Sequence, residues 1–218
     1  DMKAALFDLD GVVFDTEPQY SVFWGETCRK YRPDIPGLEN IIKGQTLVQI
    51  FDGYFAGMEA EQAEIQRGLD EFEASMDYIY VPGFVDFISE LRSHDVKTAL
   101  VTSSNIPKMN SVYRSRPEFK ELFDVLTTAE DFTMSKPHPD CYIKAMQKLG
   151  AAESQSVAFE DSFNGLKSAR GSGATVVGLA TTNPAESISP LCDIVVTDFT
   201  HLNYGKCLLA EISHNASR

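Results

Sequence analysis

Short apolar runs that alternate with helical patterns are the feature that most restricts the fold of this chain. The first run, Ala4 to Phe7, is uninterrupted and ends at Asp8, which is typical of a strand buried on both faces. Similar runs follow at 98–101, 125–128, 157–159, 175–179 and 194–196. Amphipathic helical patterns lie between most of them, at 84–93, 139–149 and 162–171. Because strands that alternate with helices form parallel sheets, we predict an α/β fold with a doubly wound parallel sheet.

One long segment interrupts this alternation. It contains three helical patterns and no strand pattern, and the helices are expected at 20–31, 47–55 and 59–76. The many acids of the last pattern are most simply a solvated helix face. Pro82-Gly83 then marks the return to alternating strands and helices. We therefore predict a small all-helical domain at 16–80, inserted into an α/β core made of 1–15 and 81–218.

The first strand is followed directly by a pair of carboxylates, Asp8 and Asp10, and then by Gly11. The two acids are separated by one residue, so they point the same way if the strand continues. Glycine allows the backbone to turn sharply after them. One carboxylate can attack phosphorus while the other donates a proton to the leaving oxygen. An alternative is a turn that carries two solvated acids, but the apolar run in front of the pair places it at a strand end.

A second acidic pair, Glu160-Asp161, also follows an apolar run. Mg²⁺ prefers oxygen ligands, typically one or two carboxylates with water and phosphate. Asp8, the carbonyl of Asp10 and Asp161 could supply these ligands from adjacent strand ends, with Glu160 ligating through water or orienting the others. The alternative is that the pair caps the following helix, where acids suit the helix dipole. The equivalent positions of the two pairs favour the metal site.

Two further segments are candidates for binding a phosphoryl group. Lys136 lies between residues that restrict its backbone, in Ser135-Lys136-Pro137-His138-Pro139. A fixed ammonium there could neutralise both the attacking carboxylate and the phosphate oxygens. Thr102 and Ser103 follow the strand pattern at 98–101, where hydroxyl and backbone N–H groups can bind a phosphoryl oxygen. The alternative for this second segment is an ordinary loop with a helix cap.

The charge of the chain excludes some classes of partner. The formal net charge is −13, whereas nucleic acids and anionic membranes bind Lys- and Arg-rich surfaces. We therefore expect no nucleic acid and no membrane partner. No secretory signal and no membrane-spanning stretch are visible. The four cysteines form no C-x-x-C pair, so we read them as idle thiols and expect a cytoplasmic protein.

In the order of its motifs the chain resembles the haloacid dehalogenase superfamily. The motifs are Asp8-Leu9-Asp10-Gly11-Val12-Val13-Phe14-Asp15-Thr16-Glu17, Thr102-Ser103, Lys136-Pro137-His138-Pro139-Asp140 and Glu160-Asp161-Ser162. The resemblance implies a Rossmann-like core with a helical cap. It implies that Asp8 becomes an aspartyl phosphate and that Asp10 is the acid/base. It also implies that Thr102 and Lys136 hold the phosphoryl group, and that Asp161, with Glu160 behind it, holds Mg²⁺.

Within that superfamily the chain is most similar to the β-phosphoglucomutase-type sugar phosphatases and mutases. The segments that carry this similarity are Asp15-Thr16-Glu17-Pro18 and Ile42-Lys43-Gly44-Gln45. The mutase carries a His where this chain has Tyr20 and an Arg where it has Leu47. The resemblance therefore implies a phosphatase rather than a mutase, because a bisphosphate intermediate would be held poorly. The mutase stays open as an alternative.

The expected substrate is a small phosphorylated metabolite, such as a sugar phosphate. Residues of the helical insert, Tyr20, Gly44, Gln45 and Thr46, are expected to select its leaving group. A receiver-like module that accepts phosphate without turnover is an alternative from another class. The helical insert and the second carboxylate, Asp10, argue against it. The sequence is compatible with a monomer or a small homo-oligomer.

Overall fold

The computed structural model describes residues 1–218 and contains a six-stranded sheet in which all neighbouring strands are parallel. The strands are β1 (Ala4–Phe7), β2 (Lys97–Val101), β3 (Val125–Thr127), β4 (Ser156–Glu160), β5 (Thr175–Leu179) and β6 (Ile194–Val196). Their spatial order is β3-β2-β1-β4-β5-β6, so the central strands β1 and β4 adjoin at the point where the order reverses. The prediction of a Rossmann-like, doubly wound parallel sheet is confirmed.

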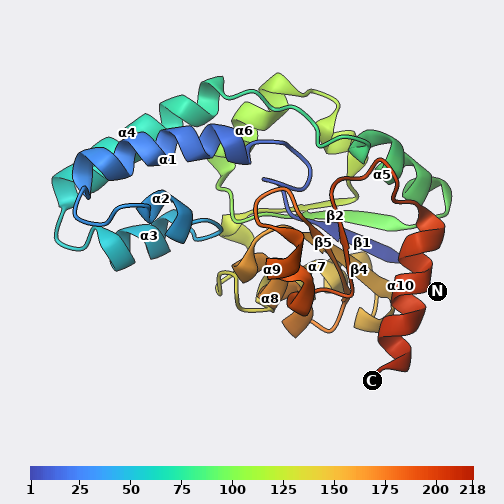
Figure 1. The fold of residues 1–218 in the computed structure, drawn as a ribbon. Helices are drawn as coiled ribbons and strands as arrows, with labels where there is room; N and C mark the ends of the chain where they lie inside the picture. The colour runs from blue at the N-terminus through green and yellow to red at the C-terminus, as the bar shows by residue number, and fades with distance from the viewer.

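Helices cover both faces of this sheet (Figure 1). The core helices are α5 (Phe84–Ser93), α6 (Ile106–Ser115), α7 (Asp140–Leu149), α8 (Phe163–Gly171), α9 (Ala185–Ile188) and α10 (Tyr204–Ala216). Short 3₁₀ turns occur at Phe119–Leu122, Ala129–Asp131, Glu153–Gln155 and Ser189–Leu191. Successive strand residues point to opposite faces, so that Phe7 packs with α5 and α10 while Leu6 packs with α7 and α8.

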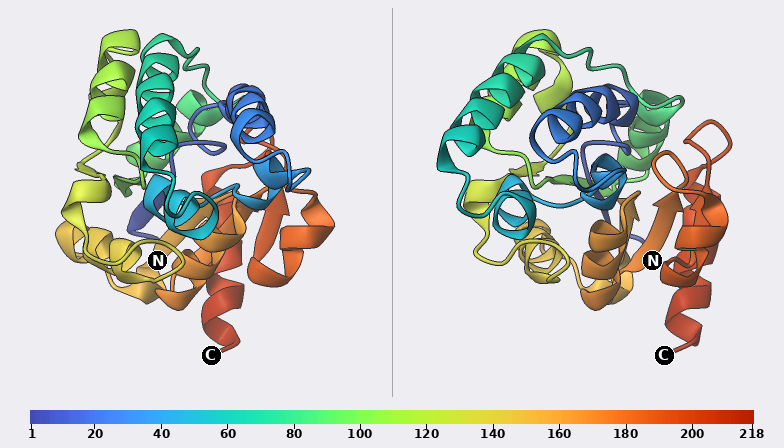
Figure 2. Two further views of the ribbon diagram at one scale, coloured as in Figure 1. Left: turned by 90° about the vertical axis from the view of Figure 1, so that its left-hand side faces the viewer. Right: turned by 60° about the vertical axis from the view of Figure 1, so that its left-hand side comes forward.

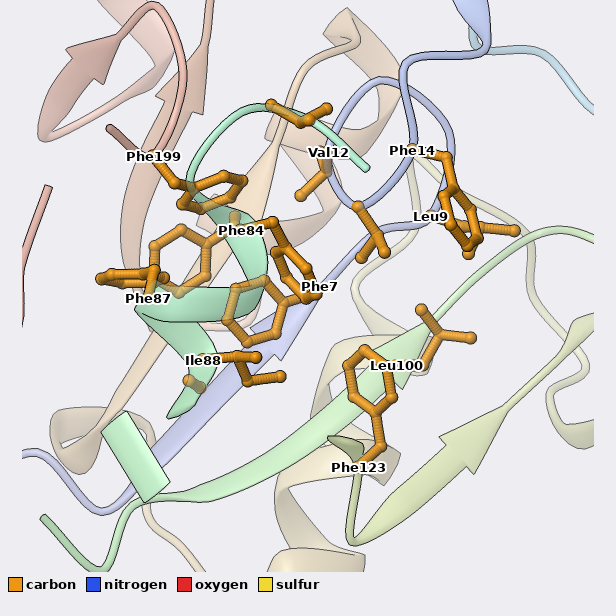
Figure 3. Close-up of a cluster of buried hydrophobic side chains, with 14 of the residues drawn as sticks. Phe7, Leu9, Val12, Phe14, Phe84, Phe87, Ile88, Leu100, Phe123 and Phe199 are labelled. Atoms are coloured by element: carbon orange, nitrogen blue, oxygen red, sulfur yellow. The ribbon is translucent and has the colours of Figure 1, made fainter. Parts of the chain in front are cut away.

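The face that carries Phe7 has an aromatic core (Figure 3). The ring of Phe7 stacks on that of Phe159 at 4.5 Å between centroids and meets the ring of Phe84 edge-on at 5.3 Å. Both arrangements are favourable for aromatic rings. Phe7 also immediately precedes Asp8, so this packing fixes the strand end from which Asp8 projects.

We expect Phe7→Ala to lower the free energy of unfolding by about 3–5 kcal/mol. Phe7 is fully buried, and its loss leaves a cavity among five aromatic rings. Urea denaturation followed by far-UV circular dichroism measures the change. A loss below about 1 kcal/mol would contradict a central role for this ring, since surface substitutions usually stay within that range.

Four further helices do not belong to the layers that cover the sheet, and they lie together to one side of it (Figures 1 and 2). They are α1 (Glu17–Tyr31), α2 (Leu38–Ile41), α3 (Leu47–Tyr54) and α4 (Glu59–Ser75). Together they enclose a separate hydrophobic cluster that includes Trp24, Leu38, Ile50, Phe55 and Ile65. This separate cluster supports the proposed division of the chain into a cap of residues 16–80 and a core of residues 1–15 and 81–218.

The two segments that join the core to α1 and α4 run beside each other. The backbone N–H of Asp15 donates to the carbonyl of Ile79 at 2.8 Å, and that of Val81 donates to the carbonyl of Val13 at 2.9 Å. Phe14 and Tyr80 form an isolated antiparallel bridge between them. The chain therefore leaves the core and returns to it at one place.

The structure also bears on the cysteines and on membrane-spanning helices. The four cysteines are free thiols, and three of them are buried. None of the helices combines the length and the apolar character that a membrane span requires.

Candidate active site

The two acidic pairs lie at neighbouring strand ends. Asp8 follows β1, Glu160 ends β4, and Phe7 is in register with Phe159 across the two strands. Ser162, directly after Asp161, is the N-cap of α8 and accepts a hydrogen bond from the backbone N–H of Gly165 at 3.1 Å. The cap of this helix is thus supplied by Ser162, so the carboxylates of Glu160 and Asp161 are not needed as its cap.

Lys136 is buried among oxygen atoms at this edge of the sheet. Its Nζ donates to Oδ1 of Asp8 at 3.0 Å, to Oε1 of Glu160 at 2.6 Å and to the carbonyl of Val101 at 3.0 Å. The hydroxyl of Tyr142 donates to the same Glu160 oxygen at 2.5 Å. Burial alone would lower the pKa of Lys136, but the carboxylates of Asp8 and Glu160 outweigh it and raise that pKa above its ordinary value. Lys136 is therefore a fixed cation.

Three carboxylates form a group that could hold a metal ion. Asp8, Glu160 and Asp161 each offer one oxygen, and these oxygens lie within 4.8 Å of one another. Oδ1 of Asp161 and Oε2 of Glu160 are buried without a hydrogen-bond partner. Burial, followed by the charge of Asp8, raises the pKa of Glu160 to about 7 and that of Asp161 well above its ordinary value. A group of hard oxygen donors, two of them buried without partners, fits Mg²⁺.

Small residues leave room for these carboxylates. Gly11 has a φ of +77°, which favours glycine, and a Cβ on it would lie 2.1 Å from Oδ2 of Asp161. A Cβ on Gly165 would lie 2.0 Å from Oε2 of Glu160. The hydroxyl of Thr182, on the loop after β5, donates to Oδ2 of Asp161. The orientation of Asp161 thus depends on loops that follow two different strands.

Asp10 lies beside this group, and both of its carboxylate oxygens accept hydrogen bonds. Oδ1 accepts a hydrogen bond from the hydroxyl of Thr16 at 2.6 Å. Oδ2 accepts one from Nζ of Lys108, which lies on α6. Thr16 is buried and directly precedes α1, so Asp10 contacts the segment that leads into the helices of the proposed cap.

Thr102 and Ser103 lie after β2 and line the same cavity as Asp8 and Lys136. Oγ1 of Thr102 donates to Oγ of Ser104 at 2.9 Å and accepts from the backbone N–H of Ser104 at 3.0 Å. Asn105 caps α6 by accepting from the backbone N–H of Lys108 at 3.0 Å. The helix cap is therefore present, at Asn105, while the binding of a phosphoryl group by Thr102 and Ser103 stays a prediction.

The cavity has a volume of about 610 Å³ and lies between the strand ends and the helices α1 to α4. Tyr20, Gly44, Gln45 and Thr46 line it, and their role in selecting a leaving group stays a prediction. Thr46 also forms a capping box with Gln49 at the start of α3, so its hydroxyl is used within the helix. Gly44 lies against Ser162, where a Cβ would be 2.7 Å from that of the serine.

Several residues of this cavity had no role in the sequence analysis. Glu17 lines it, and burial followed by the charge of Asp10 raises the pKa of Glu17 to about 7. Glu73 and Lys108 also line it, as does Gln49, whose side chain donates to the carbonyl of Lys136 at 3.1 Å. Glu17 stands in a recognised motif and could have been found there. Glu73 and Lys108 carry no local signal, because single charged residues are usually solvated.

Comparison with known proteins identifies the family. The sequence model of the haloacid dehalogenase-like hydrolase family matches residues 2–173. The chain belongs to this family. The hexitol phosphatase A of Escherichia coli is 30% identical to it over 182 residues, which cover 81% of this chain and 82% of that protein. The validoxylamine A 7'-phosphate phosphatase of Streptomyces hygroscopicus subsp. limoneus is 27% identical over 212 residues, covering 93% and 96% of the two chains.

Solved structures with the same fold include members of this hydrolase family. A family IA, variant 3 hydrolase from Entamoeba histolytica has a TM-score of 0.83 at 21% identity, with 97% of this chain and 100% of that chain covered. A β-phosphoglucomutase from Clostridium difficile has a TM-score of 0.77 at 19% identity, with 99% and 100% covered. At these identities the likeness concerns the fold. The family resemblance drawn from the sequence motifs is confirmed, and so is the expectation of an enzyme of this family.

Proposed function

We propose that this haloacid dehalogenase-like hydrolase is a Mg²⁺-dependent phosphatase of small phosphate monoesters, and that Asp8 is its nucleophile. The observation that carries the proposal is the pairing of Asp8 with the buried ammonium of Lys136 at 3.0 Å, beside two further carboxylates. Phosphoryl transfer requires chiefly the positioning of groups and the neutralisation of oxygen charge. A nucleophilic carboxylate next to fixed positive charge meets both requirements.

The proposed reaction has two steps that use the residues at the strand ends. In the first, a carboxylate oxygen of Asp8 bonds to phosphorus, the bond from phosphorus to the leaving oxygen breaks, and Asp10 donates a proton to that oxygen. In the second, Asp10 takes a proton from water, the water oxygen bonds to phosphorus, and Asp8 is released as a carboxylate. Lys136 and the hydroxyls of Thr102 and Ser103 would hold the phosphoryl oxygens in both steps.

Asp8, Asp161 and the carbonyl of Asp10 would hold Mg²⁺, with Glu160 as the outer member of the set. When bound, the ion would neutralise phosphoryl oxygen charge and offset the repulsion among the acids. Glu160 is already engaged by Lys136 and Tyr142 through Oε1. This engagement supports an outer role for Glu160, in which it orients Lys136 and the other ligands.

The composition of the cavity supports a sugar-like leaving group without a second phosphate. Leu47 lines the wall that α3 contributes, and three acids also face the cavity, namely Glu17, Glu39 and Glu73. A second phosphate would meet these acids. Three lysines line the cavity, and two of them, Lys108 and Lys136, are already paired with carboxylates, which leaves Lys43. The printed names of two relatives, a hexitol phosphatase and a validoxylamine 7'-phosphate phosphatase, agree with a hydroxylated leaving group.

A panel of phosphorylated metabolites tests this proposal. The panel contains hexitol phosphates, hexose phosphates, glycerol phosphate, nucleotides and pyrophosphate, each with Mg²⁺, and released phosphate is measured. We expect phosphate release from polyol or sugar monophosphates. Conversion of β-glucose 1-phosphate to its 6-phosphate isomer without phosphate release would instead establish a mutase. Stable phosphorylation without turnover would establish a receiver-like module.

A further inference from the structure

One buried lysine links the core to the helices of the proposed cap. The side chain of Lys108, on α6, is 4% exposed. Its Nζ contacts Oδ2 of Asp10, lies 3.7 Å from Oε2 of Glu73 on α4, and sits 4.7 Å from the centre of the Tyr20 ring on α1. The hydroxyl of Tyr20 donates in turn to Oε2 of Glu73. Two cap helices thus surround an ammonium that belongs to the core.

The buried side chain of Lys108 lies between two carboxylates, those of Asp10 and Glu73. Burial alone would lower the pKa of Lys108, but the carboxylates of Asp10 and then Glu73 outweigh it and raise that pKa. Burial raises the pKa of Glu73, and Lys108 opposes this shift. A buried ammonium is stable only while its partners remain in place. Removal of either carboxylate therefore changes the position or the hydration of the lysine.

The contact with Asp10 gives this arrangement a chemical consequence. The two carboxylate oxygens of Asp10 are bound from two sides, Oδ1 by Thr16 and Oδ2 by Lys108. Thr16 leads into α1, and Lys108 is bound by Glu73 on α4. The orientation of Asp10 is thus connected to both ends of the proposed cap. A salt bridge that served stability alone would not need to use the carboxylate that faces the reaction site.

We propose that Lys108 is a positioning residue that couples docking of the cap to the orientation of Asp10, with Glu73 and Tyr20 as its partners on the cap. This inference rests on the phosphatase function proposed above. With the cap docked, Glu73 and Tyr20 fix the ammonium, and the ammonium fixes Oδ2 of Asp10. When the cap moves away, Lys108 loses these partners and Asp10 loses a fixed hydrogen-bond donor. The acid/base is thereby ordered chiefly while the cavity is closed.

A double-mutant cycle tests the coupling between Lys108 and Asp10. We expect Lys108→Met to lower kcat on a sugar or polyol monophosphate about tenfold to hundredfold, with KM changed less than about threefold. In an Asp10→Asn background the same substitution should lower kcat by less than about threefold, because the group that Lys108 orients is already lost. Equal losses in the two backgrounds would contradict the proposal and leave Lys108 a structural residue.

The nature of the leaving group provides a second test. In the first step, p-nitrophenyl phosphate needs little proton donation, whereas an alkyl phosphate needs much. The test compares how much Lys108→Met slows phosphorylation of the enzyme by each ester in pre-steady-state measurements. The factor of slowing should be at least about tenfold larger for the alkyl ester than for the aryl ester. Equal slowing would contradict the proposal. Lys148→Met is the matched control, since it removes the same charge from an exposed site on α7.

Hydrogen exchange tests the cap contact without any assay of activity. In Lys108→Met the backbone amides of α4, and those near Thr16, should exchange at least about threefold faster than in the wild type, whereas Lys148→Met should leave them unchanged. Glu73→Gln should raise exchange in α4 as well. Unchanged exchange in both Lys108→Met and Glu73→Gln would overturn the link to the cap. Failure of the wild-type enzyme in the phosphate panel would overturn the proposed function instead, so the two failures are distinguishable.

Discussion

Asp8→Asn should lower steady-state phosphatase turnover by at least about 10³-fold. The amide is not an effective nucleophile toward phosphorus, yet it has nearly the size of the carboxylate and can still accept the hydrogen bond from Lys136. The packing of Phe7 against Phe159, next to Asp8 in the chain, does not depend on the charge of the carboxylate. Activity should therefore disappear while the fold and its stability are kept.

Phosphate release and intact-protein mass spectrometry measure this effect. The wild-type enzyme, quenched in acid during turnover, should carry one additional phosphoryl group, and Asp8→Asn should carry none. Asp52→Asn is the matched control, because it makes the same change at an exposed site on α3. Normal turnover by Asp8→Asn, in protein shown by peptide mapping to be free of deamidation, would assign the nucleophile to another residue.

Removal of divalent metal should abolish activity, and addition of Mg²⁺ should restore it. Asp8, Glu160 and Asp161 place three carboxylate oxygens within 4.8 Å of one another, and one oxygen each of Glu160 and Asp161 is buried without a partner. Without a cation these charges repel one another, and the phosphoryl group adds more negative charge to the same place. Activity that persists in protein dialysed against a chelator would remove the metal from the proposal.

Thermal unfolding supplies a readout of the same site that needs no substrate. At a Mg²⁺ concentration 100 times Kd, binding to the folded state alone adds about 2.7 kcal/mol to the free energy of unfolding. Tm should therefore rise with Mg²⁺ concentration in the wild type and in Asp52→Asn. In Asp161→Asn the rise should be largely lost, because one of the buried oxygen donors no longer carries charge. A rise of equal size in all three proteins would place the metal elsewhere.

The strand ends could be predicted from the sequence because local patterns specify them. The run from Ala4 to Phe7 places Asp8 at a strand end, and parallel strands bring such ends to one edge of the sheet. The helix at 84–93 has the predicted bounds, since its apolar stripe at Phe84, Phe87 and Leu91 is uninterrupted. α10 was not predicted, and its exposed apolar residues Leu209 and Ile212 obscure the stripe.

The contacts that cross between the core and the proposed cap could not be predicted in the same way. Lys108 and Glu73 are 35 positions apart, and each is a single charged residue outside any recognised motif. The helix α6 that carries Lys108 was itself not predicted; it has Pro107 in its first turn, where proline is well tolerated. Only the packing of α4 beside α6 shows that these two residues meet.

The paired segments around Phe14 and Tyr80 have a consequence for how such an enzyme can acquire a new substrate. Because the chain exits and re-enters side by side, the stretch between these crossing points can be exchanged for another without a change in any strand order or register. The acids at the strand ends would stay as they are, while the wall that faces the leaving group is replaced as a unit. A chimera made at these two positions is thus a direct route to redirected specificity.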